Sequence, residues 1–184
     1  MMKKTHMLTS VTAGVALTHF TPIEPTVGLF LGIVAGSVFP DIDEPQSYIG
    51  RKTSVEVFNT RIGLSSVIKG IFGHRGFTHS LLATLFVFIP YFLMLGYTSQ
   101  LDQMGLIERF ITQILMGLGF GYLFHILGDM FSKSGVPLFM PFTSKKIAIP
   151  LYTTQHFSEK VIFGLSTVLL VYLVYQEFLL NLFA

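Results

Sequence analysis

The chain has 184 residues, of which 51% are hydrophobic and only 12% are charged, about half of the roughly 25% charge typical of soluble domains. Its mean hydropathy is +0.65, so the apolar surface exceeds what one small core can hide, and we expect an integral membrane protein. The absence of Cys excludes a disulfide-stapled secreted domain, and the net charge of only +2 excludes a basic nucleic-acid binder. Any metal must therefore be held by His and carboxylate side chains.

Five apolar segments predict an all-α, polytopic helical membrane protein. They cover about residues 7–20, 27–39, 80–97, 110–127 and 161–182. The last three are long enough for a bilayer core, which needs about 17–25 residues. The first two are short and are joined by a proline-marked turn, so they form a helical hairpin that either spans thinly or is re-entrant. The whole chain, 1–184, is predicted to be a single membrane-embedded domain.

The basic residues predict the orientation of these segments. If the five segments alternate, 11 of the 12 Lys and Arg residues lie on one side, and only Arg109 lies on the other. By the positive-inside rule the basic side is the cytoplasm, which also places the N-terminus there. Two cytoplasmic connecting stretches then follow, 40–79 and 128–160, each expected to carry short helices or loops.

Ionisable residues at membrane segments are costly and usually mark a site. Four polar clusters lie at the predicted cytoplasmic helix ends: His6, Ser37 to Pro45, Gly73 to Ser80, and His125 to Asp129. His125 and Asp129 are four residues apart, so on a continuous helix both project from one face, as two ligands of one metal must. The two aspartates after Pro40 are two residues apart and point the same way if that segment is extended.

Small residues recur every four positions on the segments that lead to these clusters. The three rows are His6, Ser10, Gly14 and Thr18; Gly28, Gly32 and Gly36; and Gly117, Gly121, His125 and Asp129. Small residues at this spacing let membrane helices approach closely. The rows alone indicate helix packing, and they also predict that the ligand-bearing helices are the closely packed ones.

Each cluster also has an ordinary structural interpretation. A lone His at a helix end commonly only forms hydrogen bonds, and Asp41 or Thr78 can cap a helix or begin a turn. The joint occurrence favours a site, because four of six His and three of four Asp lie at the same predicted membrane face. Such a ligand set suits one to three zinc-like ions. His19, predicted at the opposite end, is interpreted as structural.

These motifs resemble the YdjM-like family of membrane-bound metal-dependent hydrolases of the bacterial inner membrane. The family pattern is an early His, Pro-Asp-Ile-Asp, His-Arg-Gly-x-Thr-His-Ser and His-x-x-x-Asp, and its counterparts here all lie within residues 1–142. The resemblance implies a divalent metal, most simply zinc. A more distant likeness to the zinc-dependent phospholipase C and P1 nuclease group implies up to three zinc ions in a helical bundle.

The resemblance also implies a set of metal ligands on the cytoplasmic face. They are His6, Asp41, Asp43, His74, His79, His125 and Asp129. His79, His125 and Asp129 are implied to share one ion, with a carboxylate of the Pro-Asp-Ile-Asp segment bridging or neighbouring it and His6 as a further ligand.

Hydrolysis is the chemistry that such a site performs. A divalent ion lowers the pKa of bound water toward 7 and polarises the oxygen under attack. Asp43 or Glu44 could orient that water or take its proton, and Arg75 either holds a phosphate oxygen through its planar fork or anchors the cytoplasmic face as a charge. The predicted function is thus a metal-dependent hydrolase of a phosphoester such as a phosphorylated lipid, with membrane lipids and no nucleic acid as partners. An ion-binding transporter component and a non-catalytic metal-stabilised scaffold are the alternatives.

Two features in the last third of the sequence have two interpretations each. His156 and Glu159 form either a further metal pair or an ordinary polar pair. The stretch 132–141, rich in Gly and Pro, is either a lid over the site or an ordinary connector.

Overall fold

A computed structural model of the protein describes residues 1–44, 54–57, 60–63, 66, 70, 75–98 and 104–183. Within these residues the main elements are five helices: α1 (Lys3–Phe20), α2 (Val27–Gly36), α5 (Leu81–Thr98), α6 (Leu106–Met130) and α7 (Phe157–Phe183). The predicted helical class and the five predicted segments are therefore confirmed.

The connecting stretches carry short elements. Two 3-10 turns, η1 (Pro40–Asp43) and η2 (Phe77–His79), precede and follow a two-stranded antiparallel hairpin of β1 (Ser54–Val57) and β2 (Thr60–Gly63). Short helices or loops were expected in this stretch, and the hairpin was not predicted from the sequence.

Helix boundaries differ from the apolar segments where polar residues continue a helix. α1 begins at Lys3, four residues before the apolar segment, because backbone hydrogen bonds do not require apolar side chains. α2 begins where the Thr26 side chain accepts a hydrogen bond from the Leu29 N–H, a common N-cap arrangement. It ends at Gly36, one turn before Pro40 begins η1.

Two helices in the described part of the chain are long and apolar enough to cross a bilayer. These are α6 over Leu106–Met130 and α7 over Phe157–Glu177, and α5 adds a shorter apolar stretch over Leu81–Gly96. α2 has 10 residues, which gives it a length of about 15 Å, half of a bilayer core of about 30 Å. The prediction that the second segment is short is confirmed, whereas α1 has 18 residues and is longer than predicted.

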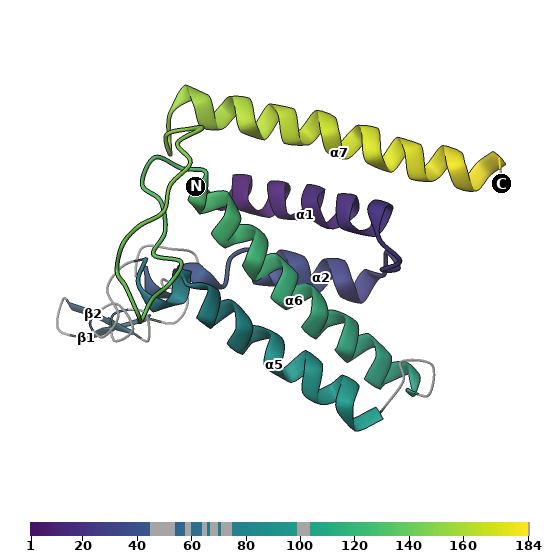
Figure 1. Ribbon diagram of the computed structural model, residues 1–184, viewed down its shortest axis with the longest axis horizontal. Coiled ribbons are helices and arrows are strands. Elements are labelled where there is room, and N and C mark those ends of the chain that lie inside the picture. Colours follow the sequence, from purple (N-terminus) through teal and green to yellow (C-terminus); the bar gives the residue numbers. More distant parts are fainter. Residues whose placement is uncertain are drawn as a thin grey trace.

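The helices run alternately up and down, so their connections gather at two ends (Figure 1). α6 crosses the middle of the molecule and packs against α1, α2 and α5, whereas α7 packs against α1. One end holds the start of α1, both 3-10 turns, the hairpin and the connector 131–156. A small apolar core of Ala83, Tyr122, Ile126 and Val136 joins α5, α6 and the connector at this end.

α2 and α6 contact each other backbone to backbone through glycines. A Cβ atom on Gly32 would lie 2.2 Å from the Ile114 carbonyl oxygen, and one on Gly117 would lie 2.0 Å from the Leu29 carbonyl oxygen. A Cβ atom on Gly36 or on Gly121 would likewise lie 2.2 Å from a backbone carbonyl oxygen of the other helix. The predicted close approach of these two helices is therefore confirmed, and it sets the end of α2 against the last turns of α6.

Gly117→Ala should lower the free energy of unfolding by about 1–3 kcal/mol, because the new methyl group must push α2 away from α6. Thermal unfolding of the detergent-purified protein, followed by circular dichroism, measures the change. The matched control is Gly164→Ala on α7, where no atom lies within 4 Å of the position that the new methyl group would take. That control should be neutral or stabilising by up to about 1 kcal/mol. Equal stabilities of the two variants would contradict the close contact.

Candidate metal centre

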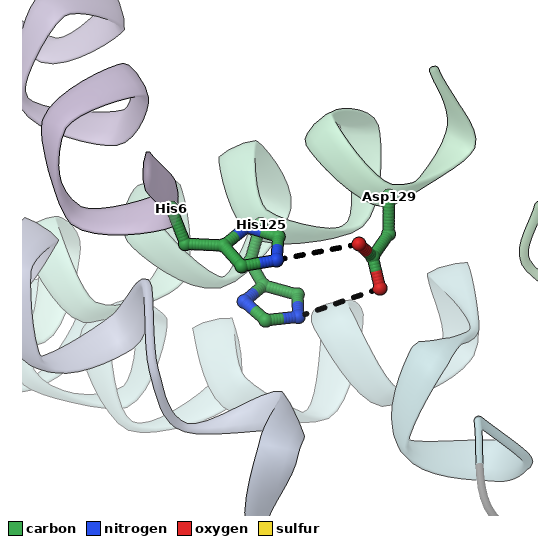
Figure 2. A group of neighbouring side chains, drawn as sticks. All are labelled: His6, His125 and Asp129. Carbon is green, nitrogen blue, oxygen red and sulfur yellow. Dashed lines mark ion pairs between the residues drawn. The ribbon is translucent and has the colours of Figure 1, made fainter. Parts of the chain in front are cut away.

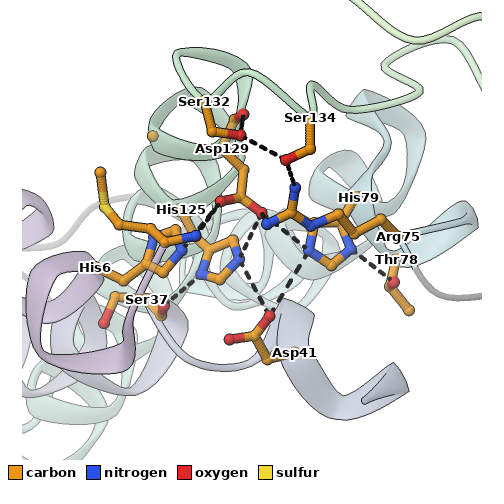
Figure 3. A network of polar contacts seen from close by, with 12 residues as sticks. His6, Ser37, Asp41, Arg75, Thr78, His79, His125, Asp129, Ser132 and Ser134 are labelled. Atoms are coloured by element: carbon orange, nitrogen blue, oxygen red, sulfur yellow. Dashed lines mark hydrogen bonds and ion pairs between the residues drawn. The ribbon is translucent and has the colours of Figure 1, made fainter. Parts of the chain in front are cut away.

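Side chains from four separate segments meet at the connector end of the bundle (Figure 3). They are His6 on α1, Asp41 on η1, His79 on η2, and His125 with Asp129 on α6. All are almost completely buried except Asp41, whose side chain is 27% exposed. The structure therefore brings five of the seven predicted ligands together, although they are far apart in the sequence.

Four of these side chains surround one small space. The Nε2 atoms of His79 and His125 face Oδ1 of Asp41 and Oδ2 of Asp129, and the four His–Asp distances lie between 3.6 and 3.9 Å. Zinc with tetrahedral ligands at about 2.0–2.2 Å would set neighbouring ligand atoms roughly 3.3–3.6 Å apart. The two nitrogens and two oxygens are therefore spaced a few tenths of an ångström wider than a zinc cage. We call these four residues the N2O2 group.

A second group shares two residues with the first (Figure 2). His6, His125 and Asp129 offer ligand atoms that all lie within 4.8 Å of one another. The His6 Nε2 atom is 3.3 Å from Asp129 Oδ1, and the rings of His6 and His125 stack with centroids 3.7 Å apart. The two oxygens of Asp129 thus face different groups, so Asp129 is placed as the carboxylate between them.

The unprotonated nitrogen of His125 can be assigned from its hydrogen bond. Its Nδ1 atom lies 2.6 Å from the Ser37 carbonyl oxygen, and because a carbonyl only accepts, Nδ1 carries the proton and donates it. The Nε2 lone pair is then left facing the two carboxylates. A ring N–H donated to a backbone carbonyl is the usual outer-shell arrangement of a metal-binding His.

His79 is oriented in the same way by a side-chain relay. The Thr78 hydroxyl donates to Asp43 Oδ2 at 2.6 Å and lies 3.1 Å from His79 Nδ1. Because that hydroxyl proton is already donated, the Thr78 oxygen accepts from Nδ1–H, and Nε2 again keeps its lone pair. The Nε2 atoms of His79 and His125 are buried without a hydrogen-bond partner in the described part of the chain. Such atoms are costly to bury, and a divalent cation would satisfy both.

Asp43 lies behind His79 rather than in either ligand group. Its Oδ2 atom accepts hydrogen bonds from the Thr78 hydroxyl and from the Arg75 backbone N–H at 2.9 Å, and it is 3.5 Å from Nδ1 of His79. The extended segment assumed for the two aspartates is wrong, because η1 is a 3-10 turn. At three residues per turn, positions i and i+2 point in different directions, so Asp41 and Asp43 face different sides of the centre.

Arg75 lies beside the N2O2 group on the connector side. Its Nη2 atom is 2.9 Å from Asp129 Oδ2, and its Nη1 donates to the Ser134 hydroxyl (Figure 3). Its backbone φ is 53°, a left-handed conformation that persists only where the surroundings enforce it. The bonds of its backbone N–H to Asp43 and of its side chain to Asp129 supply that constraint.

The remaining site candidates take other positions. His74 lies outside the described residues. Glu44 follows η1, and its backbone N–H donates to the Asp41 carbonyl. The buried Glu159 carboxylate accepts the backbone N–H groups of Met2 at 2.5 Å and Gln155 at 2.6 Å, whereas His156 is exposed. These contacts favour the ordinary polar interpretation of the last pair.

The end of α1 that lies away from the centre carries a His–Glu pair. His19 lies at the end of α1 farthest from the centre, and its Nδ1 atom is 2.6 Å from Glu177 Oε1 on α7. This contact ties α1 to α7 and agrees with the structural role expected for His19.

The supporting roles of three residues were not predicted from the sequence, although Ser37 lies in one of the predicted polar clusters. Ser37 acts through its carbonyl group, for which no side-chain signal exists. The Tyr122 hydroxyl donates to the Thr78 carbonyl, and the Tyr152 hydroxyl donates to the Gly128 carbonyl at 2.8 Å. Burial raises the pKa of Tyr152 above its ordinary value, which keeps this hydroxyl protonated as a donor.

The fold and the centre define a helical membrane protein with a buried His and carboxylate cluster. Residues 1–182 match the family described as YdjM inner membrane protein. The chain therefore belongs to the YdjM inner membrane protein family, and this membership supports an inner-membrane location.

Curated relatives extend this comparison. The chain is 31% identical over 179 residues to the uncharacterized protein YvsG of Bacillus subtilis, covering 97% of each protein. It is 37% identical over 106 residues to the inner membrane protein YdjM of Escherichia coli, covering 56% of this chain and 44% of that protein. The chain thus spans nearly all of YvsG but less than half of YdjM. No solved structure matches the chain, and the likeness to the phospholipase C and P1 nuclease group stays a prediction.

Protein purified without a metal-affinity tag should contain zinc or another divalent transition metal, and His125→Ala should lose it because His125 belongs to both ligand groups. Elemental mass spectrometry measures the metal content, and circular dichroism checks the fold. His156→Ala, an exposed His outside both groups, is the matched control and should keep the metal. A folded wild-type protein that takes up no metal from zinc- or manganese-containing buffer would refute the centre.

Asp43→Asn should weaken zinc binding about 10–100-fold, the usual loss when an outer-shell partner of a metal ligand is removed. Competition with a chromogenic chelator measures the affinity. Glu44→Gln is the neighbouring control and should leave the affinity unchanged. If Asp43→Asn binds zinc as the wild type does, Asp43 does not position His79.

Proposed function

We propose that this protein is a metal-dependent hydrolase that cleaves a phosphoester, such as that of a phosphorylated lipid, at the cytoplasmic face of the inner membrane. The observation that carries the proposal is the orientation of two histidines. Ser37 and the Thr78–Asp43 pair occupy both Nδ1–H groups, so both Nε2 lone pairs face Asp41 and Asp129. This arrangement is typical of metal-binding histidines and is costly for buried histidines that bind nothing.

Zinc is the cation that best fits this ligand chemistry. Its preferred ligands are nitrogen and oxygen atoms of the kind that the N2O2 group offers, and the chain has no Cys. His6, with His125 and Asp129, offers a place for a second ion. A bound ion would lower the pKa of a water molecule and polarise the phosphoryl oxygen under attack.

Basic side chains near the centre suit an anionic substrate. Arg75 is oriented by Asp129 and Ser134, so its guanidinium group is pre-positioned beside the centre to hold a phosphate oxygen. Lys133, Lys145 and Lys146 are exposed on the connector at the same end, where they would attract anionic headgroups.

Other residues control access and protonation. Asp41 is the candidate ligand that reaches solvent, so water would approach the centre past its carboxylate. We infer that Asp43 acts as a positioning residue, because its Oδ2 atom is occupied by two donors. Glu44 then remains the candidate general base.

The alternating helices support a multi-pass topology with the N-terminus in the cytoplasm. The connector end carries Arg75 and the exposed lysines of segment 131–156, whereas Arg109 lies near the start of α6 at the other end. The positive-inside rule places the connector end, and with it the centre, on the cytoplasmic side.

One observation favours a non-catalytic scaffold as the second candidate. The N2O2 group alone supplies four ligands, and four protein ligands complete the tetrahedral shell of a structural zinc site. A catalytic centre needs one position open to water. The exposed Asp41 is the ligand that would yield that position.

Zinc-loaded protein in lipid vesicles should release product from a phosphoester such as phosphatidic acid, and Arg75→Lys should lower kcat/KM about tenfold or more. Lys keeps the charge but not the planar fork that holds a phosphate oxygen and the Ser134 hydroxyl together. Colorimetric phosphate release reports the rate for lipid phosphomonoesters, and mass spectrometry of the products reports the cleavage of lipid phosphodiesters.

Arg109→Lys at the opposite end is the matched control and should retain the wild-type rate. His125→Ala should abolish turnover together with metal binding. Wild-type protein that holds zinc yet hydrolyses no phosphoester, while losing thermal stability on metal removal, would overturn the hydrolase proposal in favour of the scaffold.

A further inference from the structure

An apolar groove lies beside the metal centre, between α1, α6 and α7. Its volume is about 320 Å³, at the lower end of the roughly 300–1,000 Å³ common for small-molecule sites. Its walls include Thr9 and Ala13 from α1, Leu127 from α6, Phe131 and Leu151 from the connector and Ile162 from α7. Three helices and the connector therefore line an apolar groove next to the polar cluster.

The polar groups of this groove already have partners within the protein. The Thr9 hydroxyl donates to the Thr5 carbonyl at 2.8 Å, and the Tyr152 hydroxyl donates to the Gly128 carbonyl at 2.8 Å. The wall therefore offers a ligand mainly apolar contact. A polar ligand would lose its hydrogen bonds to water without replacement, whereas a hydrocarbon chain would lose none.

The groove reaches the metal centre at one end. Gly128 lines the groove and directly precedes Asp129, and a Cβ atom at Gly128 would lie 3.5 Å from Nδ1 of His6. Met1 also lines the groove, and its amino group lies 2.9 Å from Asp129 Oδ1. Gly128 and Met1 thus lie between the apolar space and the candidate ligands His6 and Asp129. A molecule held at both places must be hydrocarbon in the groove and polar at the centre.

The groove also borders the surface that faces lipid in a membrane-embedded bundle. α7 is apolar and long enough to cross a bilayer, and its outer side chains Leu165, Val168 and Val171 are 62–69% exposed. Ile162, on the same helix, forms one wall of the groove. A chain can therefore pass from the bilayer into the groove without crossing water.

We infer that the groove holds one acyl chain of a membrane phospholipid whose phosphate lies at the metal centre. The placement of the phosphate rests on the proposed function, and the groove adds the substrate class: an amphiphilic phosphoester rather than a water-soluble one. Arg75 selects the anionic end, and the groove selects the chain. Shortening the chain by one buried methylene should weaken binding about fourfold, the equivalent of about 0.8 kcal/mol.

Photo-crosslinking tests this inference on the full chain. The protein is reconstituted in vesicles of phosphatidylethanolamine and phosphatidylglycerol that contain phosphatidic acid with a diazirine on one acyl chain. Mass spectrometry should locate crosslinks on Leu127, Phe131 and Leu151. Ala13→Phe fills the groove and should lower their yield about tenfold or more, because several methylenes lose their contacts.

Val168→Phe adds similar bulk to the exposed face of α7 and should keep the wild-type yield. Ile162→Phe fills the groove from the opposite wall and replaces Ala13→Phe if that variant does not fold by circular dichroism. Unchanged groove crosslinks in the folded, filled variant, or crosslinks confined to the outer face of α7, overturn the inference.

Phosphate release is measured in the same vesicles, so that the two proposals fail separately. Groove crosslinks without hydrolysis overturn the hydrolase and leave the acyl-chain groove standing. Hydrolysis without groove crosslinks overturns the groove and leaves the hydrolase standing.

Discussion

Close backbone contact between α2 and α6 positions one half of the candidate metal centre. Because both helices carry glycines, carbonyl oxygens of each helix occupy the space that side chains of the other helix would otherwise fill. Because α2 ends at Gly36, the contact also sets the Ser37 carbonyl 2.6 Å from the His125 ring. A packing feature of the apolar interior thus determines which nitrogen of a buried His is free to bind.

The other half of the centre is held by polar contacts instead of close helix packing. Asp43 binds the Thr78 hydroxyl and the Arg75 backbone, and through Thr78 it orients His79. Tyr122 on α6 ties the same turn to the bundle through the Thr78 carbonyl. The two histidines of the N2O2 group are therefore held by different kinds of contact, and each is oriented by a neighbour that does not itself face the shared space.

The centre lies where a buried polar cluster borders the apolar surface of the helices. Buried His and Asp side chains and Arg75 gather at the end that carries the connecting segments, and apolar helix surface begins within one turn of them. Ionisable groups at such a boundary are costly unless they bind something. A membrane phosphoester, anionic at one end and hydrocarbon at the other, matches both environments at once.

The five helices, the close-packing rows of glycine and the pairing of His125 with Asp129 could be predicted from the sequence, because they follow from local spacing along a helix. Five of the seven predicted ligands meet at the centre, since each is an ionisable group beside an apolar segment, whereas Asp43 lies behind His79. The sequence did not determine which aspartate turns inward, because that depends on η1 being a 3-10 turn rather than an extended segment. The placement of Asp129 between the two groups and the roles of Ser37 and Tyr122 could not be predicted, because each depends on a contact between elements distant in the chain.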